Sequence, residues 1–284
     1  QSADRPFFIA VGFWKPHLPF LAPPAYFQMY DKNSIPMAPN PFRAAGAPSI
    51  AFENWGELRQ YSGIPPAGQY FSEALRRDLK HAYYASTSFV DAQVRRVLAA
   101  LESAGLSQKT VVVLLGDHGF HLGEQNDWGK HTNFEVGARV PVIIRAPGKS
   151  ADQHSDALIE LVDLYPTIVE LAGLAVPDAQ QHGGLPLEGD SFAGIVNNPA
   201  AESRRGAFSQ WIRDGYLGRS IRTRSYRYTE WVRGSSRYYE LYDHVIDPNE
   251  TVNVINKPAY AAVLPLLQQA LAAGGQKDLP PELR

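Results

Sequence analysis

Hydrophobic residues recur every three or four positions between Ser72 and Ala104, and this spacing predicts one long amphipathic helix. A serine at its start can cap the first turn, and Gly105 stands just past its end, where a left-handed residue commonly closes a helix. The same criteria predict a shorter helix from about Leu164 to Ala172, with Asp163 as its cap.

Several short apolar runs lack the helical spacing, which predicts strands buried in a sheet. These runs are Phe7 to Gly12, Thr110 to Leu115, Val140 to Arg145 and Ala157 to Val162. Because such strands alternate with helices, we expect an α/β fold in which a mixed, mainly parallel sheet lies between helices.

From Gly206 onward, short runs of alternating apolar and polar residues predict a small antiparallel sheet. The runs are Ala207 to Ile212, Arg219 to Arg224, Tyr226 to Val232 and Tyr238 to Tyr242, and a helix near Tyr260 to Ala273 follows them. We therefore expect a large α/β domain over residues 1–205 and a C-terminal antiparallel α+β subdomain over residues 206–284.

The segment from Phe13 to Tyr70 is dense in proline, glycine and asparagine, and its length is unusual for a connection within a compact domain. It also contains many aromatic residues, which disordered segments lack. We expect it to be an ordered loop packed over a site.

Composition narrows the class of protein only a little. The formal net charge is −2, so the chain lacks the basic excess typical of nucleic-acid-binding proteins. No apolar run reaches the roughly 18 residues that a membrane span requires. The chain has no cysteine, hence no disulfide. It opens almost directly on a predicted core strand with no signal peptide before it, which favours a start within a domain.

Candidate chemistry begins at Asp117 and His118, which follow the predicted strand Thr110 to Leu115. Ligands of open α/β sheets bind at the carboxyl ends of strands, where a carboxylate and an imidazole could hold a metal ion or move a proton. The alternative is a turn in which the aspartate caps and a glycine supplies a positive φ.

A dense group of charged and polar residues follows within fourteen positions. Its members are His121, Glu124, Asp127, Lys130 and His131. Such a group is costly to bury without a purpose, and Lys130 could present a cation to an anionic group. The alternative is a solvated loop.

His17 is held between Pro16 and Pro19, whose rings fix φ on both sides of it. A histidine with a pKa near 6.5 suits general acid catalysis at neutral pH. The alternative is a histidine satisfied within a packed loop.

Several blocks of the sequence resemble type I sulfatases of the alkaline-phosphatase superfamily, and most closely the iduronate-2-sulfatase group. The blocks occur in family order, and they are the Lys-Pro-His segment within Phe7–Tyr30, the Gly-Asp-His-Gly and Trp-Gly-Lys segments within Tyr83–Gly148, the Asp-Leu-Tyr-Pro-Thr segment from Asp163, and the segment from Leu241 to Asn253. Residues 1–205 would then be the later part of the family's catalytic domain.

The resemblance implies a role for each matching residue. Asp117 and His118 would belong to a site for one Ca²⁺ ion, with Asp117 the safer ligand because calcium prefers oxygen. The alternative for His118 is a hydrogen bond to the nucleophile or to the sulfate. His17 would protonate the leaving alkoxide, and Lys130 would contact the sulfate and leaving oxygens. Lys15 and His131 are weaker candidates for binding substrate anions.

The family nucleophile is a formylglycine made from Cys or Ser in a Cys/Ser-x-Pro/Ala-x-Arg motif, and this sequence shows no convincing copy. The family's Asp-Asp pair of calcium ligands is also missing. We expect both in an N-terminal portion of the same domain, upstream of these residues, and we expect this chain alone to be inactive.

The function implied is hydrolysis of a sulfate ester in a sulfated carbohydrate, such as a glycosaminoglycan. One alternative is a phosphate or phosphonate ester hydrolase of the same superfamily, and another is a non-catalytic module that binds sulfated glycans. We expect no nucleic-acid partner and no membrane span. By analogy with the family, the location would be periplasmic, secreted or lysosomal.

Overall fold

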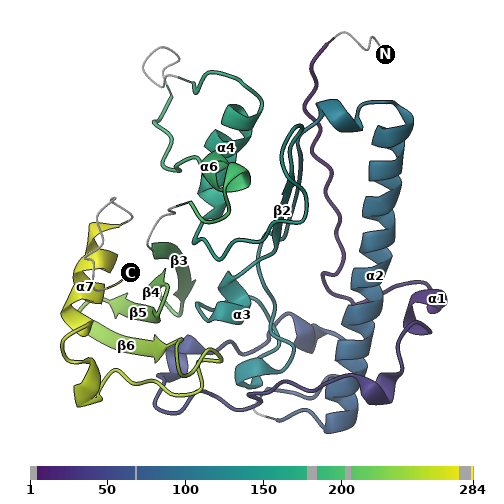
Figure 1. The fold of residues 1–284 in the computed structure, drawn as a ribbon. Coiled ribbons are helices and arrows are strands. Elements are labelled where there is room, and N and C mark those ends of the chain that lie inside the picture. The colour runs from purple at the N-terminus through teal and green to yellow at the C-terminus, as the bar shows by residue number, and fades with distance from the viewer. Residues whose placement is uncertain (1–4, 68, 178–183, 202–205, 275–282, 284) are drawn as a thin grey trace. The chain divides into compact units, whose positions relative to one another are not determined.

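The computed structural model describes residues 5–67, 69–177, 184–201, 206–274 and 283 (Figure 1). By its internal packing the chain forms two compact units. Unit 1 consists of Gln1–Met37 and Leu58–Gly105, and unit 2 consists of Ala38–Glu57 and Leu106–Arg284. The domain boundary predicted between residues 205 and 206 stays a prediction.

Unit 1 is built on α2 (Glu73–Ser103), which confirms the long helix predicted from the hydrophobic spacing. The Oγ of Ser72 accepts the N–H of Leu75 at 3.2 Å, and Gly105 has a φ of 70° past the helix end. The other helices of this unit are short: α1 (Pro24–Phe27), η1 (Lys32–Ser34) and η3 (Leu58–Gln60).

Aromatic residues of the proline-rich segment pack edge-on against α2, which confirms that this part of the segment is ordered. Ring centroids lie 5.3 to 5.4 Å apart in the pairs Phe20–Tyr83, Tyr26–Phe89 and Tyr30–Tyr84. Whether the segment covers a site stays a prediction.

The strand predicted from Phe7 to Gly12 is wrong, because these residues have no regular secondary structure. Phe8 is 81% exposed and Ile9 is 69% exposed. A strand needs a neighbour to take its backbone hydrogen bonds, and among the described residues none pairs with this run.

Unit 2 contains a two-stranded ladder of β1 (Val112–Leu115) and β2 (Val142–Arg145). Both strands were predicted, but they pair antiparallel, with Leu115 opposite Val142, so the expected parallel pairing is wrong here. Leu114 and Ile143 are exposed rather than buried on both faces. Two strands alone do not cover their own faces, and side-chain pattern does not specify strand direction.

The strand predicted from Ala157 to Val162 is also wrong, since only an isolated bridge at Leu158 remains of it. Glu160 and Asp163 exchange capping-box hydrogen bonds, which turn the chain into η6 (Leu161–Asp163). The side chain of Asp163 is engaged there and with the N–H of Asp190, so it does not cap the following helix as predicted.

That following helix, α4 (Leu164–Leu171), confirms the second predicted helix. The other short helices of unit 2 come before, between and after the two strands in the sequence. They are η2 (Ser49–Ala51), η4 (Ser107–Lys109), η5 (Glu124–Asn126), α3 (Glu135–Ala138) and α6 (Ala193–Asn197).

A four-stranded antiparallel meander confirms the small C-terminal sheet. Its strands are β3 (Gly206–Arg213), β4 (Tyr216–Thr223), β5 (Tyr226–Arg233) and β6 (Ser236–Asp243), in sequence order. Asp214 and Gly215 join the first two strands with φ values of 50° and 77°. Positive φ at both residues suits the tight hairpin turns that match strand twist.

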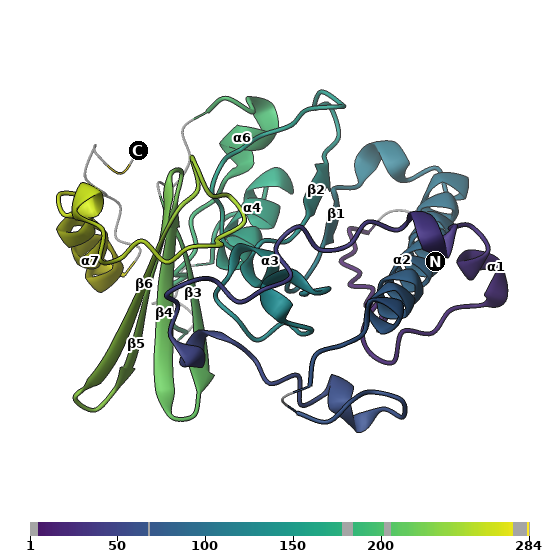
Figure 2. The ribbon, with the colours of Figure 1, turned by 90° about the horizontal axis from the view of Figure 1, so that it is seen from below.

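The two faces of this sheet bury different side chains, as strand alternation requires. One face packs on α7 (Leu264–Ala273), which follows η7 (Pro258–Tyr260), through Ile221, Tyr228 and Leu241. The opposite face meets α3 and the segment around η2, through Trp231 and Tyr242. Figure 2 shows the sheet between α7 and α3.

Within the described parts of the chain, no helix combines the length and the apolar character that crossing a bilayer would require.

Candidate functional site

Unit 2 contains an open groove with a volume of about 1410 Å³. Asp117, His118, Lys130 and His131 all line it, so the structure brings these four predicted site residues to one surface. The groove wall also carries the guanidinium groups of Arg139, Arg222, Arg224 and Arg227 and the carboxylates of Glu135, Asp156 and Glu160. The surface is therefore polar and mixed in charge.

Asp117 and His118 follow β1 after a single glycine, and both line the groove. The Asp117 side chain is 86% exposed. One of its oxygens accepts the His118 N–H at 3.1 Å, and the other lies 3.6 Å from His118 Nε2. The His118 Nδ1 lies 2.8 Å from the Gly119 carbonyl oxygen, which fixes the ring. The carboxylate is thus available to a cation.

The position of this pair depends on a close approach between Gly119 and α3. The Gly119 N–H donates to the Gly137 carbonyl at 2.9 Å. A Cβ on Gly119 would overlap the Val136 carbonyl oxygen. Only glycine fits there, so the Gly-Asp-His-Gly turn is seated on α3.

Lys130 lies on the loop that leads to α3, and its side chain is 14% exposed. Its Nζ lies 3.5 Å from a carboxylate oxygen of Glu57. The loop approaches Glu53 as well, because a Cβ on Gly129 would overlap the Glu53 carboxylate. The ammonium group is therefore held at the groove wall by Glu57, while Glu53 packs against the backbone of the same loop.

His131 is oriented on two sides. Its Nδ1 lies 3.2 Å from a Glu53 carboxylate oxygen, and its ring stacks on Trp211 with 4.2 Å between centroids. Burial alone would raise the pKa of Glu53, but the hydrogen bond and the charge of His131 lower it below its usual value. Glu53 therefore stays ionised and favours a proton on Nδ1.

Two other polar residues of the predicted group serve the loop rather than the groove. His121 is fully buried, with Nε2 2.7 Å from the Thr132 hydroxyl. The buried carboxylate of Asp127 accepts the N–H groups of Glu53 and Trp128. Burial is the largest influence on Asp127 and raises its pKa. These side chains hold the loop that presents Lys130.

His17 and Lys15 belong to unit 1. The Nδ1 of His17 lies 2.9 Å from the Leu18 carbonyl oxygen, and its ring centroid is 5.0 Å from that of Trp14. The Lys15 Nζ donates to the carbonyls of His17 and Pro19, which closes a compact turn. Their predicted roles at the site stay predictions.

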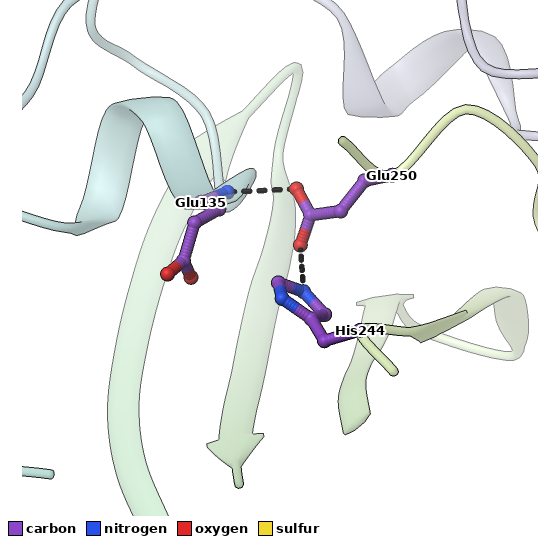
Figure 3. A group of neighbouring side chains, drawn as sticks. All are labelled: Glu135, His244 and Glu250. Carbon is purple, nitrogen blue, oxygen red and sulfur yellow. Dashed lines mark hydrogen bonds and ion pairs between the residues drawn. The ribbon is translucent and has the colours of Figure 1, made fainter. Parts of the chain in front are cut away.

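Three groups that sequence reasoning did not select come together beside the groove: Glu135, His244 and Glu250 (Figure 3). Arg227 occupies the place that a cation would take, with its Nε 2.6 Å from Glu250 and its Nη2 on Glu135. A guanidinium already neutralises both carboxylates, so we read the group as an ion-pair cluster. Glu135 lies more than 100 positions before His244 and Glu250, and no local pattern signals that the three residues meet.

The residues that line the groove fit a metal site only in part. Asp117 offers exposed carboxylate oxygens, the ligand type that calcium prefers. Within the described part of the chain, no group of three potential ligands includes Asp117. Calcium takes six to eight oxygen ligands, so Asp117 and His118 could supply only a fraction of them.

The sequence of this chain matches two protein-family models and several individual relatives. A sequence model of the Sulfatase family matches residues 1–174, and one of the N-sulphoglucosamine sulphohydrolase C-terminal region matches residues 123–277. Iduronate 2-sulfatase of Mus musculus is 30% identical over 93% of this chain and 60% of its own length. The Homo sapiens enzyme is 32% identical over 82% and 53%. The chain thus spans little more than half of these relatives.

The fold has matches among solved structures too. A phosphonate monoester hydrolase of Agrobacterium radiobacter superposes with a TM-score of 0.78 at 25% identity, over 95% of this chain and 56% of that one. This similarity confirms the predicted α/β class.

Proposed function

This chain belongs to the sulfatase family, and from that membership we propose that the protein hydrolyses a sulfate ester of a sulfated sugar or glycan. The observation that carries the proposal is the meeting of Asp117 and His118 with Lys130 and His131 along one groove. A carboxylate for a cation and an ammonium group for an anion are the complementary charges that sulfate transfer needs.

Lys130 acts on the sulfate oxygens and on the oxygen of the departing alcohol, where negative charge grows during cleavage. Its partial burial beside Glu57 limits water around the ammonium group and strengthens that attraction. His131 carries its Nδ1 proton toward Glu53, so its orientation toward a substrate anion is fixed before binding.

His17 donates the proton to the leaving oxygen, and Lys15 supports substrate binding, by resemblance to the Lys-Pro-His segment of the family. Asp117 and His118 would hold Ca²⁺, which polarises a bound sulfate when present. The formylglycine nucleophile and the remaining calcium ligands come from a portion of the domain outside these 284 residues. We therefore expect no turnover by the 284 residues alone.

The substrate we propose is an anionic carbohydrate. Arg222 and Arg224 line the groove and can meet its charged groups. Arg219 faces the other side of the sheet, where Glu230 lies 3.8 Å away, and it is therefore not part of the site. Two of the relatives are named iduronate 2-sulfatases, after a sulfated uronate, and an anionic sugar of this kind suits such a surface. A periplasmic, secreted or lysosomal location follows from the family alone.

The test is kinetic and uses the full-length protein with 4-nitrophenyl sulfate. Lys130→Ala and His17→Ala should each lower kcat/KM by about 10²-fold or more. Lys109→Ala removes an exposed lysine outside the groove and should leave kcat/KM unchanged. Wild-type rates in all three variants would reject the proposed site.

A phosphonate monoester hydrolase is the second candidate, favoured by the structural match. Relative rates on 4-nitrophenyl sulfate, 4-nitrophenyl phosphate and a phosphonate monoester separate the two activities. A third possibility is a module that binds sulfated glycans without cleaving them. Binding of a sulfated oligosaccharide with no sulfate release by the full-length protein would favour it.

A further inference from the structure

Glu250 is a buried carboxylate on the loop that follows β6, and its side chain is 2% exposed. One oxygen accepts from Arg227 Nε at 2.6 Å and lies 2.8 Å from His244 Nε2. The other accepts the backbone N–H of Glu135 at 2.7 Å (Figure 3). Three polar groups thus surround the carboxylate, and one of them is the backbone N–H of the first residue of α3.

Arg227 extends this contact to the Glu135 side chain. Its Nη2 donates to the Glu135 carboxylate, which also accepts from Arg222 Nε at 3.2 Å. Burial would raise the pKa of Glu250, but Arg227 and His244 lower it, so the carboxylate keeps its charge. The pKa of Glu135 is lowered in the same way, by Arg227 and Arg222 against the effect of burial.

A second set of hydrogen bonds joins η5 to the loop that contains Asn249 and Glu250. The buried side chain of Gln125 donates through Nε2 to the carbonyls of Asn249 and Glu250, at 2.9 and 2.8 Å. Both Gln125 and Glu250 have a positive φ, 57° and 53°. Non-glycine residues keep this conformation only where the surroundings hold it. The 249–250 loop is therefore held by hydrogen bonds to both α3 and η5.

The segments held in this way carry the proposed site. Lys130 and His131 lie four to five residues before Glu135 on the same loop. On its other side, α3 accepts the Gly119 N–H through Gly137, which seats the turn that carries Asp117 and His118. A shift of α3 would move both pairs.

We propose that Glu250 is a positioning residue: through Arg227 and Glu135 it fixes α3, and so it sets the places of Asp117–His118 and Lys130–His131 in the groove. The inference rests on the proposed function for its catalytic consequence, but the positioning itself is independent of the reaction.

Amide hydrogen exchange, measured by mass spectrometry on the full-length protein, tests the positioning. Glu250→Gln should raise exchange rates about tenfold in peptides covering 117–121 and 130–138, because local opening becomes easier. Peptides from α7 should exchange as in the wild type. Glu230→Gln is the matched control, because it removes an equal charge from the opposite face of the same sheet. It should leave both site peptides unchanged.

An equal rise across all peptides would show a global loss of stability and would overturn the proposal, as would no change in the site peptides. If Glu250→Gln gives no cooperative thermal transition, Glu135→Gln carries the test, because it keeps the Glu250 contact to the backbone N–H. It should give the same regional rise, and unchanged site peptides would overturn the proposal.

Catalysis gives a separate readout. In an active sulfatase, Glu250→Gln should lower kcat on 4-nitrophenyl sulfate about tenfold or more, while Glu230→Gln leaves it unchanged. Regional exchange changes in a protein that cleaves no sulfate ester would reject the proposed function and leave the positioning intact. A wild-type kcat beside raised regional exchange would overturn the catalytic part of the inference.

Discussion

The carboxyl group of Glu240 is buried on the face of the β3–β6 sheet opposite to α7. It is 2% exposed, and its oxygens accept from Trp231 Nε1 and the Tyr242 hydroxyl, each at 2.7 Å. Burial raises its pKa to about 7, although both hydrogen bonds act in the opposite direction. The folded protein therefore holds a proton here at pH values at which the unfolded chain has lost it.

This raised pKa predicts a specific pH dependence. Stability from Glu240 is fully present below its unfolded pKa, near 4.3, and is lost as pH rises through about 7. Glu240→Gln should remove this loss, since the Tyr242 hydroxyl can turn to accept from the amide. In urea melts, the free energy of unfolding should fall between pH 5 and pH 8 by up to about 3 kcal/mol more in the wild type than in the variant. Parallel losses would contradict the raised pKa.

At the scale of elements, α3 is only four residues long, yet both segments that carry the proposed site contact it or lead into it. Its stability cannot come from its own hydrogen bonds, because so short a helix is not stable alone. Contacts from the Gly119 turn and from Arg227 and Glu250 supply it instead.

Gly119→Ala should therefore disturb this element. The added Cβ would overlap the Val136 carbonyl oxygen, which is backbone and cannot swing away. We expect a loss of about 1–3 kcal/mol in the free energy of unfolding, measured by denaturant titration. Gly194→Ala is the control, since its Cβ would meet nothing within 4 Å on a helix where alanine is preferred. A neutral Gly119→Ala would mean that the close approach is absent.

At the scale of the whole molecule, the net charge of −2 provides little attraction for a polyanion, so the proposed binding of a sulfated glycan would depend on local cations. The arginines of the β3–β6 sheet divide by face. Arg222 and Arg224 line the groove, whereas Arg219 pairs with Glu230 on the other side.

Arg224→Ala should weaken binding of a sulfated oligosaccharide about 3- to 10-fold in titration calorimetry at low salt, with a smaller effect at high salt because exposed charges are screened. Arg219→Ala removes the same charge from the same strand region but away from the groove, and should leave the affinity unchanged. Equal effects of the two substitutions would indicate attraction by total charge and not by the groove.

The sequence by itself determined the features that depend on neighbours along the chain. The period of α2, its Ser72 cap and the alternation of β3 to β6 follow from local sterics and from one-sided burial, and the structure confirms them. The motif residues Asp117, His118, Lys130 and His131 could also be chosen from sequence, and they share a groove. The roles proposed for His17 and Lys15 stay predictions.

Only the tertiary structure decided the features that depend on distant partners. The apolar runs Phe7 to Gly12 and Ala157 to Val162 have strand composition but no strand, since a strand forms only where another supplies hydrogen bonds. The contacts that hold α3 join Glu135 to residues 92 and 115 positions later. No local pattern encodes such a pairing, because an isolated Arg or Glu looks the same in sequence whether it is solvated or buried against its partner.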